Sequence, residues 1–338
     1  MNGCEAEDIY FTEAYSKLYE KMENGETVCF QMDCPYGRVR HLFLKRPVPK
    51  LVDGIAYYDA VTAYGYGGPM ICSLEQEENI SPEETRKKLL DCFSRDYAAF
   101  CAENRIVAEF VRFHPVFQNG QIFEKIFSAQ PIRNTVGTDL AHYPDFPQWE
   151  YSRRCRKNIR ACMRAGMTVE VTQGPESLEE FAEIYRVTMD RNNADDAYYW
   201  DEDYFDGFLR NFREHILLVK VLYQGKMIAA AMDFVWGDVV TIHLSGTLTE
   251  YLHMSPAYLL RYGVTLWARD HGCRMVYHGG GRTNDPEDTL YLFKKQFGER
   301  TVLPFYVGRK VWNREIYERL SAGCDGETWF PAYRGKSK

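Results

Sequence analysis

The chain has 338 residues, of which 45% are apolar, and its 41 Lys and Arg against 48 Asp and Glu leave a formal net charge of -7. This composition excludes a disordered chain and a strongly basic nucleic-acid-binding protein, so an anionic partner must be bound by a local basic patch. The length predicts two domains, and no apolar run reaches the roughly 20 residues of a membrane-spanning helix.

The N-terminal segment 1–8 is acidic and has no apolar core, so we expect no signal peptide and a cytoplasmic location. The 10 cysteines are scattered, as at Cys4, Cys72, Cys162 and Cys273. We interpret them as free thiols of a reducing compartment. Cys29 and Cys34 are too few and too widely spaced for zinc, and we expect no metal site.

In the first half we expect, in chain order, strands at 27–32, 38–44 and 54–61, a helix from Ser81 to about Asn104, and a strand at 106–113. Ser81 and Pro82 are typical of an N-cap and the first helical position, and the acids that follow suit the helix dipole. Pro131, Pro144 and Pro147 interrupt any regular pattern between 127 and 147. We therefore place the domains at 1–140 and 141–338.

In the second half we expect a basic helix within 151–166, a strand at 167–171, helices at 177–192 and 203–213, a hairpin of 216–223 and 227–235, a strand at 239–246, a helix from Ser255 to about Gly272, and a strand at 274–278 ended by glycines. Ser255-Pro256 repeats the Ser-Pro helix start of the first half. A helix followed by a strand thus occurs twice, which indicates an internal duplication of a mixed α/β architecture.

Six cations and no acid lie between Tyr151 and Val169. Arg153, Lys157, Arg160 and Arg164 share one helical face, opposite an apolar stripe, and Arg156 adds to the charge. A solvated amphipathic helix and a phosphate-binding surface both fit this pattern. In the second case Arg156 and Arg160 meet the phosphates of a tRNA acceptor stem, a nucleotide-sugar or coenzyme A.

The segment that carries most information runs from Gly279-Gly280-Gly281 through Asp288 to Leu290-Tyr-Leu-Phe-Lys-Lys-Gln-Phe297. This segment resembles the C-terminal part of Fem-like proteins, a group with the acyl-CoA N-acyltransferase (GNAT) fold. Their sequences also end with a glycine pair, an acid and a Leu-Tyr-x-Phe-Lys-x-x-Phe run. Tyr64 to Pro69, Arg112 to Pro115 and Tyr185 to Arg191 support the resemblance over most of the chain. It implies two tandem GNAT-like domains and an α/β fold with mixed sheets.

The resemblance also implies roles in acyl transfer. Lys294 matches the family's lysine and is expected to supply positive charge where the oxyanion develops, with Phe293 packed beside it to order the acyl acceptor. The base is expected at His114, where Fem enzymes commonly carry an acid, although a lone histidine after a strand is more often structural. This departure, with the third glycine and His278, is more similar to Fem-like acyltransferases of envelope polysaccharides.

Binding of the two substrates is expected at separate groups of residues. Acceptor-binding candidates are Arg191, Tyr198, Tyr258, Tyr66 and Arg112, because arginine holds diphosphates and aromatic rings stack on sugars or bases. A tight structural turn is the alternative for the loop around Tyr66. Donor or phosphate-binding candidates are Ser255, at a helix N-terminus, Gly279, Gly280, Arg156 and Arg160.

The segment 247–254 lacks the glycine-rich pattern usual for coenzyme A in GNAT proteins. The donor is therefore left as an acyl-CoA or an aminoacyl-tRNA, with no tightly bound cofactor. The expected acceptor is an amino group of a nucleotide-linked or other cell-envelope precursor. The alternative function is a catalytically weak binding module for nucleic acid or nucleotide-sugars.

Overall fold

The computed structural model describes residues 6–75, 80–195, 198–324 and 329–335, so most of the N-terminal segment, Cys4 included, lies outside the described residues. The chain divides into two compact units, Met1–Ile132 with Pro304–Lys338 (unit 1) and Arg133–Leu303 (unit 2). The expected domains, 1–140 and 141–338, differ from this division because the C-terminal segment packs with unit 1. There β12 pairs with β5, and α12 packs on β5.

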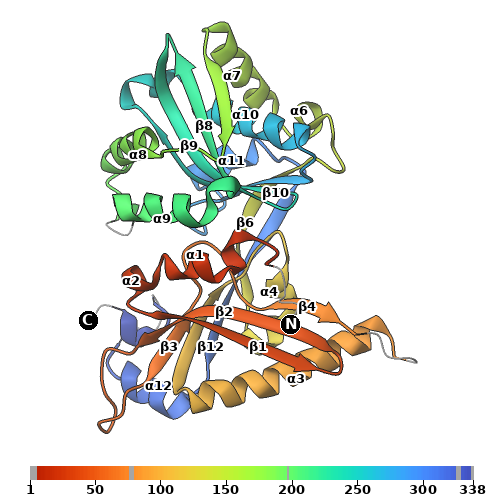
Figure 1. Cartoon of the computed structure of the whole chain (residues 1–338), viewed down its shortest axis with the longest axis vertical. Helices are drawn as coiled ribbons and strands as arrows, with labels where there is room; N and C mark the ends of the chain where they lie inside the picture. Colours follow the sequence, from red (N-terminus) through yellow and green to blue (C-terminus); the bar gives the residue numbers. More distant parts are fainter. Residues whose placement is uncertain (1–5, 76–79, 196–197, 325–328, 336–338) are drawn as a thin grey trace. The chain divides into compact units, whose positions relative to one another are not determined.

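Unit 1 is built on a mixed sheet with the order β1-β2-β3-β5-β12, and β4 also pairs with β2 (Figure 1). Only the β3–β5 pair is parallel among the pairs of this unit's described strands. Its elements are η1 (Ile9–Phe11), α1 (Glu13–Lys17), α2 (Glu20–Glu23), β1 (Glu26–Cys34), β2 (Gly37–Pro47), β3 (Tyr58–Val61), β4 (Met70–Leu74), α3 (Pro82–Glu103), β5 (Ile106–Arg112), α4 (Asn119–Ile122), α5 (Glu124–Phe127), α12 (Arg314–Ser321) and η5 (Ala332–Arg334). Strands β6 (Gln130–Asp139) and β12 (Val302–Val311) carry the chain between the units.

Helix α3 forms where its cap and its apolar spacing predict it. Ser81 is the N-cap, and its Oγ accepts a hydrogen bond from the Glu84 N–H at 3.2 Å. Leu89, Phe93, Tyr97 and Cys101, four residues apart, are fully buried. The helix lies along one face of the sheet of β1 and β2 (Figure 1).

A buried polar network lies within this core. Glu109 on β5 is fully buried and accepts hydrogen bonds from three side chains. Its Oε1 is 2.6 Å from His41 Nε2, and its Oε2 accepts from Tyr97 Oη and Trp312 Nε1, both at 3.0 Å. The network joins β2, α3, β5 and the residue after β12, so Glu109 fixes the position of several segments through one carboxylate.

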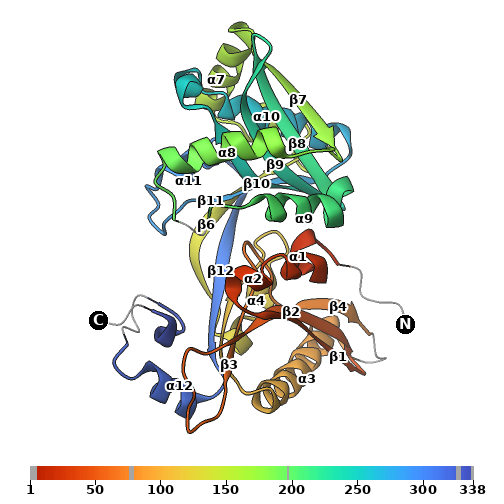
Figure 2. The ribbon, with the colours of Figure 1, turned by 60° about the vertical axis from the view of Figure 1, so that its left-hand side comes forward.

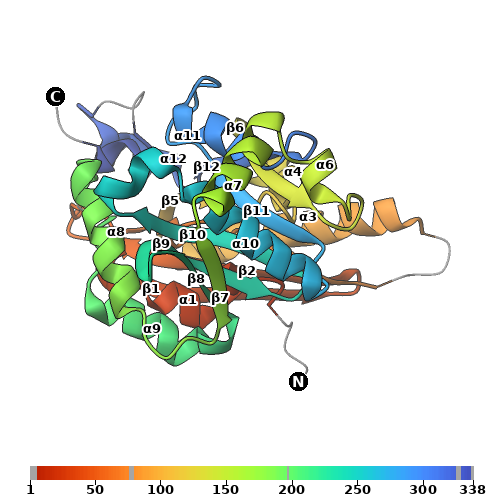
Figure 3. The same cartoon turned by 90° about the horizontal axis from the view of Figure 1, so that it is seen from above.

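Unit 2 has the strand order β6-β11-β10-β9-β8-β7. Helices α8 and α9 lie on one face of this sheet (Figure 2), and α7 and α10 lie side by side on the other (Figure 3). The elements are α6 (Phe146–Trp149), α7 (Arg153–Arg164), β7 (Thr168–Gln173), α8 (Glu179–Arg191), α9 (Glu202–Phe212), η3 (Arg213–His215), β8 (Ile216–Tyr223), β9 (Lys226–Trp236), β10 (Val239–Thr247), η4 (Thr249–Met254), α10 (Ala257–Asp270), β11 (Met275–Gly280) and α11 (Thr289–Lys295). The predicted mixed α/β fold is confirmed.

The same local arrangement occurs in both units. Two parallel strands are connected through a long helix in each unit: β3 and β5 through α3, with β4 before the helix, and β10 and β11 through α10, with η4 before the helix. The predicted hairpin of β8 and β9 is also present, and Gln224 and Gly225 both have positive φ, as its tight turn requires.

Three local expectations differ from the structure. Segment 127–147 is not irregular throughout, because β6 begins at Gln130 and holds Pro131 near its start; a proline there removes only a terminal donor. The glycines do not end β11, which continues through Gly279 and Gly280. Cys72 is disulfide-bonded, although the other described cysteines are free.

Candidate functional site

Strands β10 and β11 separate partway along unit 2. They pair in parallel at only three positions, the last of which is Thr241 opposite Tyr277. Beyond it, no ladder joins the described residues of the two strands. β10 stays paired with β9 as far as Thr247, and β11 stays paired with β6, with a bulge after Tyr277.

Lys294 lies at the end of β11 beside this separation. Helix α11, which carries it, packs on β11, and Lys294 Nζ donates a hydrogen bond to the Gly280 carbonyl at 2.7 Å. Burial, with the positive charges of Arg261 and Arg133, lowers the pKa of Lys294 to about 7, and Asp288 opposes this shift. The amine is therefore near its midpoint of protonation at neutral pH.

Asp288 organises the loop between β11 and α11. Its carboxylate accepts hydrogen bonds from the Tyr291 N–H as the N-cap of α11, and from the N–H groups of Arg282 and Thr283. These bonds, the one from Tyr291 foremost, lower the pKa of Asp288 to about 2. A Cβ on Gly281 would lie 2.5 Å from Asp288 Oδ1, so the close approach of the carboxylate requires glycine there.

Two of the predicted aromatic residues lie together beside Lys294. The rings of Phe293 and Tyr258 meet edge to face, with centroids 5.1 Å apart. The Tyr258 hydroxyl donates to Gln296 Oε1 at 3.1 Å. Lys294, Phe293, Tyr258, Gly279 and Gly280 thus form one cluster, which we call the lysine site.

The sequence did not single out Arg261, the buried cation of this cluster. Arg261 is 7% exposed, and its guanidinium lies over the rings of Phe293 and Phe297. The available signal was its position, because Arg261 falls on the apolar stripe of α10 three residues before Val264 and seven before Ala268. A charge in a buried stripe requires partners.

The structure does not place Ser255 at the start of a helix, where we expected a donor phosphate to bind. Ser255 has φ +60 and lies outside α10, whose N-cap is Pro256, without a side-chain cap. Its carbonyl accepts the Tyr258 N–H at 3.2 Å, so an N–H group expected to face a phosphate is already paired. The Ser-Pro pattern is overridden here because the preceding turn η4 ends in a left-handed residue.

Three other candidates lie together in unit 1. His114 is fully buried, and its Nδ1 accepts the Val116 N–H at 3.2 Å. The Tyr66 ring lies 5.0 Å from the His114 ring, centroid to centroid, and Arg112 Nη1 donates to the Thr62 carbonyl at 2.9 Å. Burial and the occupied Nδ1 disfavour His114 as a general base, because a base must reach the amine's proton.

The acceptor candidates at the end of α8 are tied to backbone groups. Arg191 Nη1 donates to the Thr247 carbonyl at 2.8 Å, which places Arg191 at the far end of β10. The Tyr198 ring is exposed, while its carbonyl accepts the Tyr185 hydroxyl at 3.0 Å. Arg191 therefore helps to hold the end of β10.

Helix α7 presents most of its cations to solvent, but Arg156 is an exception. Its Nη1 donates to the carbonyls of Pro147, Gln148 and Tyr151, at 2.9, 3.3 and 2.5 Å. Arg160 is exposed, as are the other cations of the predicted face. Arg156 Nη1 thus binds carbonyls at the end of the short helix α6, which competes with the phosphate-binding role expected of Arg156.

Replacing Arg156 with methionine is expected to lower the free energy of unfolding by about 1–3 kcal/mol, because three carbonyls, two of them in partly buried bonds, lose a charged donor. Arg160→Met, on the same helix, is the matched control and should have little effect, since an exposed charge contributes little to stability. Urea unfolding of both variants measures the difference. Equal stabilities would show that the three bonds of Arg156 contribute nothing.

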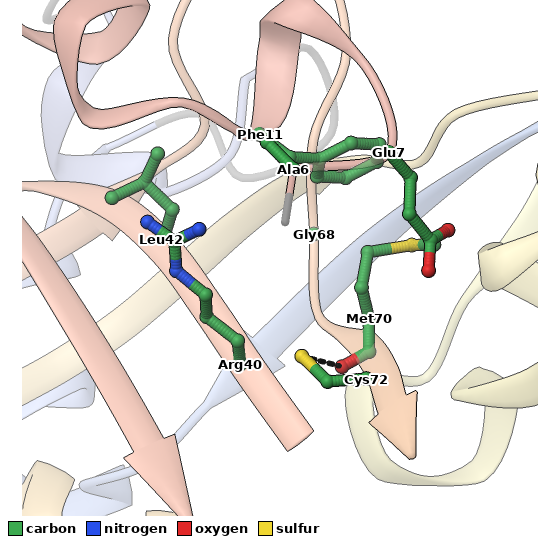
Figure 4. Close-up of a pocket in the computed structure, with 8 residues that line it drawn as sticks. All are labelled: Ala6, Glu7, Phe11, Arg40, Leu42, Gly68, Met70 and Cys72. Carbon is green, nitrogen blue, oxygen red and sulfur yellow. Dashed lines mark hydrogen bonds between the residues drawn. The ribbon is translucent and has the colours of Figure 1, made fainter. Parts of the chain in front are cut away.

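A shallow depression lies on the surface of unit 1 (Figure 4). It has a volume of about 280 Å³, part of it open to solvent. Its lining residues are Ala6, Glu7, Phe11, Arg40, Leu42, Gly68, Met70 and Cys72. Arg40 already bonds Cys29 Sγ and pairs with Glu13, so the pocket offers less chemistry than the lysine site.

Comparison with known proteins gives a family match that lies within unit 2. Residues 151–295 match the family described as "Acetyltransferase (GNAT) domain". The UDP-N-acetylmuramoylpentapeptide-lysine N(6)-alanyltransferase of Weissella viridescens is 24% identical over 198 residues. That match covers 57% of each chain, so only about half of the relative's length is represented.

Solved structures extend the similarity of fold over most of the chain. The structure of FemX has a TM-score of 0.64 at 15% identity, covering 92% of this chain and 94% of that one. The C-terminal domain of a putative lysylphosphatidylglycerol synthetase from Agrobacterium fabrum has a TM-score of 0.54 at 14% identity, with 90% and 92% covered. The fold is that of two tandem GNAT-like domains, and the family match lies in unit 2. The chain is similar in sequence to the alanyltransferase and in fold to FemX.

The part of the chain that the structure describes contains no candidate for a membrane-spanning helix. Among the helices in residues 6–75, 80–195, 198–324 and 329–335, none combines the length and apolar character needed to cross a bilayer. In the same residues, His, Cys, Asp and Glu side chains form no group of three or more that could hold a metal ion.

Proposed function

We propose that this chain is a Fem-like acyltransferase that transfers an acyl or aminoacyl group to an amino group of a cell-envelope precursor. One observation carries the proposal. A lysine whose pKa is lowered to about 7 lies at the end of β11, where β10 and β11 separate, within the segment that matches a GNAT domain. Perturbed amines in such positions are typical of catalytic sites.

The chemistry requires an acceptor amine, an oriented ester or thioester, and a donor for the oxyanion. The acceptor nitrogen forms a bond to the acyl carbon, and the carbon–oxygen or carbon–sulfur bond to the donor breaks. Lys294 Nζ, positioned by its bond to the Gly280 carbonyl, supplies charge or a proton at the reacting carbonyl. Phe293 and Tyr258 provide an apolar wall that excludes water beside it.

The acceptor is proposed from the relative. The Weissella viridescens protein is named for alanyl transfer to the lysine of a UDP-linked muramoylpentapeptide. A nucleotide-linked precursor with a free amine is therefore the first acceptor to test, with aminoacyl-tRNA and acyl-CoA as alternative donors. Nucleotide-linked precursors and both donors occur in the cytoplasm, where we place the reaction.

A ligand panel tests the proposal in two stages. Melting temperature is measured with acetyl-CoA, tRNA, UDP-N-acetyl sugars and UDP-linked muropeptides, because a ligand of the folded state raises stability. Transfer from labelled acyl-CoA or aminoacyl-tRNA to each binding acceptor is then followed. Stabilisation by a UDP-linked acceptor together with transfer supports the proposal. Binding of tRNA or nucleotide-sugars without transfer would instead support the alternative of a binding module.

A further inference from the structure

Arg261 has fixed partners on two sides. Its Nη1 is 3.0 Å from His278 Nδ1, and its guanidinium carbon lies 5.4 Å from the centroid of the Phe293 ring and 5.6 Å from that of Phe297. Both rings belong to the segment that carries Lys294. The cation is therefore held against that segment by one hydrogen bond and two cation–π contacts.

The directions of the hydrogen bonds follow from the donors and acceptors present. Arginine can only donate, so His278 Nδ1 is the acceptor. The Thr138 hydroxyl donates to the Phe297 carbonyl at 2.6 Å, so it accepts from His278 Nε2, 2.8 Å away. His278 is then a neutral ring with its proton on Nε2. Burial and the charges of Arg261 and Lys294 lower its pKa well below the ordinary value, in agreement with this assignment.

This chain of bonds joins α10, β11, β6 and the end of α11 through side chains that are almost entirely buried. Arg261 cannot move away from Lys294 without breaking these hydrogen bonds. Its pKa is lowered by burial to about 10, so it stays charged at neutral pH. Asp233 on β9, which attracts it, has a pKa raised by burial to about 7 and is only partly ionised there.

The charges that face Lys294 come from several elements. Arg261 on α10 and Arg133 on β6 repel its ammonium, Asp288 before α11 attracts it, and His278 on β11 is neutral. The Asp288 carboxylate is also shared among three backbone N–H groups of its own loop. Repulsion of the Lys294 ammonium therefore exceeds its attraction. After burial, the charge of Arg261 is the largest cause that lowers the pKa of Lys294.

We propose that Arg261 is a positioning residue that keeps Lys294 ready to release and accept a proton at neutral pH, so that Lys294 is the proton acceptor for the attacking amine. The catalytic part of this inference rests on the proposed function. As the nitrogen–carbon bond forms, the proton of the amine passes to neutral Lys294 Nζ, and the ammonium so formed supplies the positive charge that stabilises the oxyanion. When the bond to the donor breaks, Lys294 returns that proton to the leaving oxygen or sulfur, so no other reactant is needed.

Competitive labelling with acetic anhydride tests the state of Lys294 without any substrate. The intact chain is labelled between pH 5 and 10, and mass spectrometry follows acetylation of Lys294 and of its exposed neighbour Lys295, the internal reference. In the unmodified protein, Lys294 should reach half of its full reactivity near pH 7, because only the neutral amine reacts. Arg261→Gln should move that midpoint up by about one pH unit or more, because a repelling charge is removed.

Two further variants complete the test. Arg261→Lys keeps the charge and should restore the midpoint of Lys294. If Arg261→Gln acted only through lost packing, Arg261→Lys would not restore the midpoint. Asp288→Asn removes an attracting charge and should move the midpoint down, so it tests the same field in a chain that retains Arg261. An unmoved midpoint in folded Arg261→Gln, or an upward shift in Asp288→Asn, overturns the proposal.

The labelling result is separate from the proposed function, because it needs neither donor nor acceptor. With an acceptor in hand, Arg261→Gln should lose transfer at pH 7 by about 5-fold or more and regain it at higher pH. Loss at every pH with an unchanged labelling midpoint would assign Arg261 to substrate contact and overturn its positioning role. Failure of transfer in the unmodified protein with normal labelling would count against the proposed function alone.

Discussion

Replacing Lys294 with methionine is expected to lower kcat about 100-fold, with little change in acceptor binding. A decrease of about 100-fold is typical of enzymes that lose one group that stabilises charge in the transition state. Methionine keeps most of the apolar stem of lysine, so α11 should remain packed on β11. Steady-state transfer gives the rate, and a circular dichroism melt shows that the fold is retained.

Lys295→Met is the matched control, since Lys295 is the exposed neighbour on the same helix. It removes the same charge without touching Gly280 or the lysine site, and kcat should stay close to that of the unmodified protein. Full turnover by Lys294→Met would show that Lys294 has no part in the chemistry. A similar loss in both variants would point to the charge of α11 rather than to the position of Lys294.

Replacing Glu109 with leucine is expected to lower the free energy of unfolding by about 3–5 kcal/mol. The carboxylate is the hydrogen-bond acceptor for His41, Tyr97 and Trp312, and all of these donors lie in the core of unit 1. Leucine leaves them buried without that acceptor, which costs more than a lost surface contact. Urea unfolding followed by circular dichroism measures the change.

Glu109→Gln provides a graded comparison. The amide keeps the shape and one acceptor oxygen, so its cost should fall between that of leucine and zero. Glu318→Ala, which removes an exposed pair with Arg314 at 3.0 Å, is the surface control and should have a far smaller effect. If Glu109→Leu and Glu318→Ala cost the same, the buried network contributes nothing to stability.

Local sequence determined the elements whose signals lie within a few residues. Helix α3 begins where Ser81 predicts a cap and buries side chains four residues apart. The hairpin of β8 and β9 turns where Gln224 and Gly225 accept a left-handed backbone. The basic helix α7 ends near Gly166, whose φ is +87. Caps, turns and periodicity depend on near neighbours, so a single sequence is enough to find them.

The same local patterns failed where another segment decided the outcome. Ser255 and Pro256 are residues typical of a helix start, yet the preceding turn places Ser255 in a left-handed conformation outside α10. Arg156 belongs to a basic helix, yet the end of α6 uses its guanidinium. His114 follows a strand, as predicted for a base, yet it is buried against Tyr66.

The sequence by itself determined the type of elements, the position of the glycine and lysine segment, and the family that this segment resembles. Only the tertiary structure decided that residues 304–338 pack with unit 1. It alone also brought Arg261 and Arg133 near Lys294, from a helix and a strand that are far from Lys294 in the chain. Burial and charge set the pKa of a lysine, and both depend on which distant segments pack together.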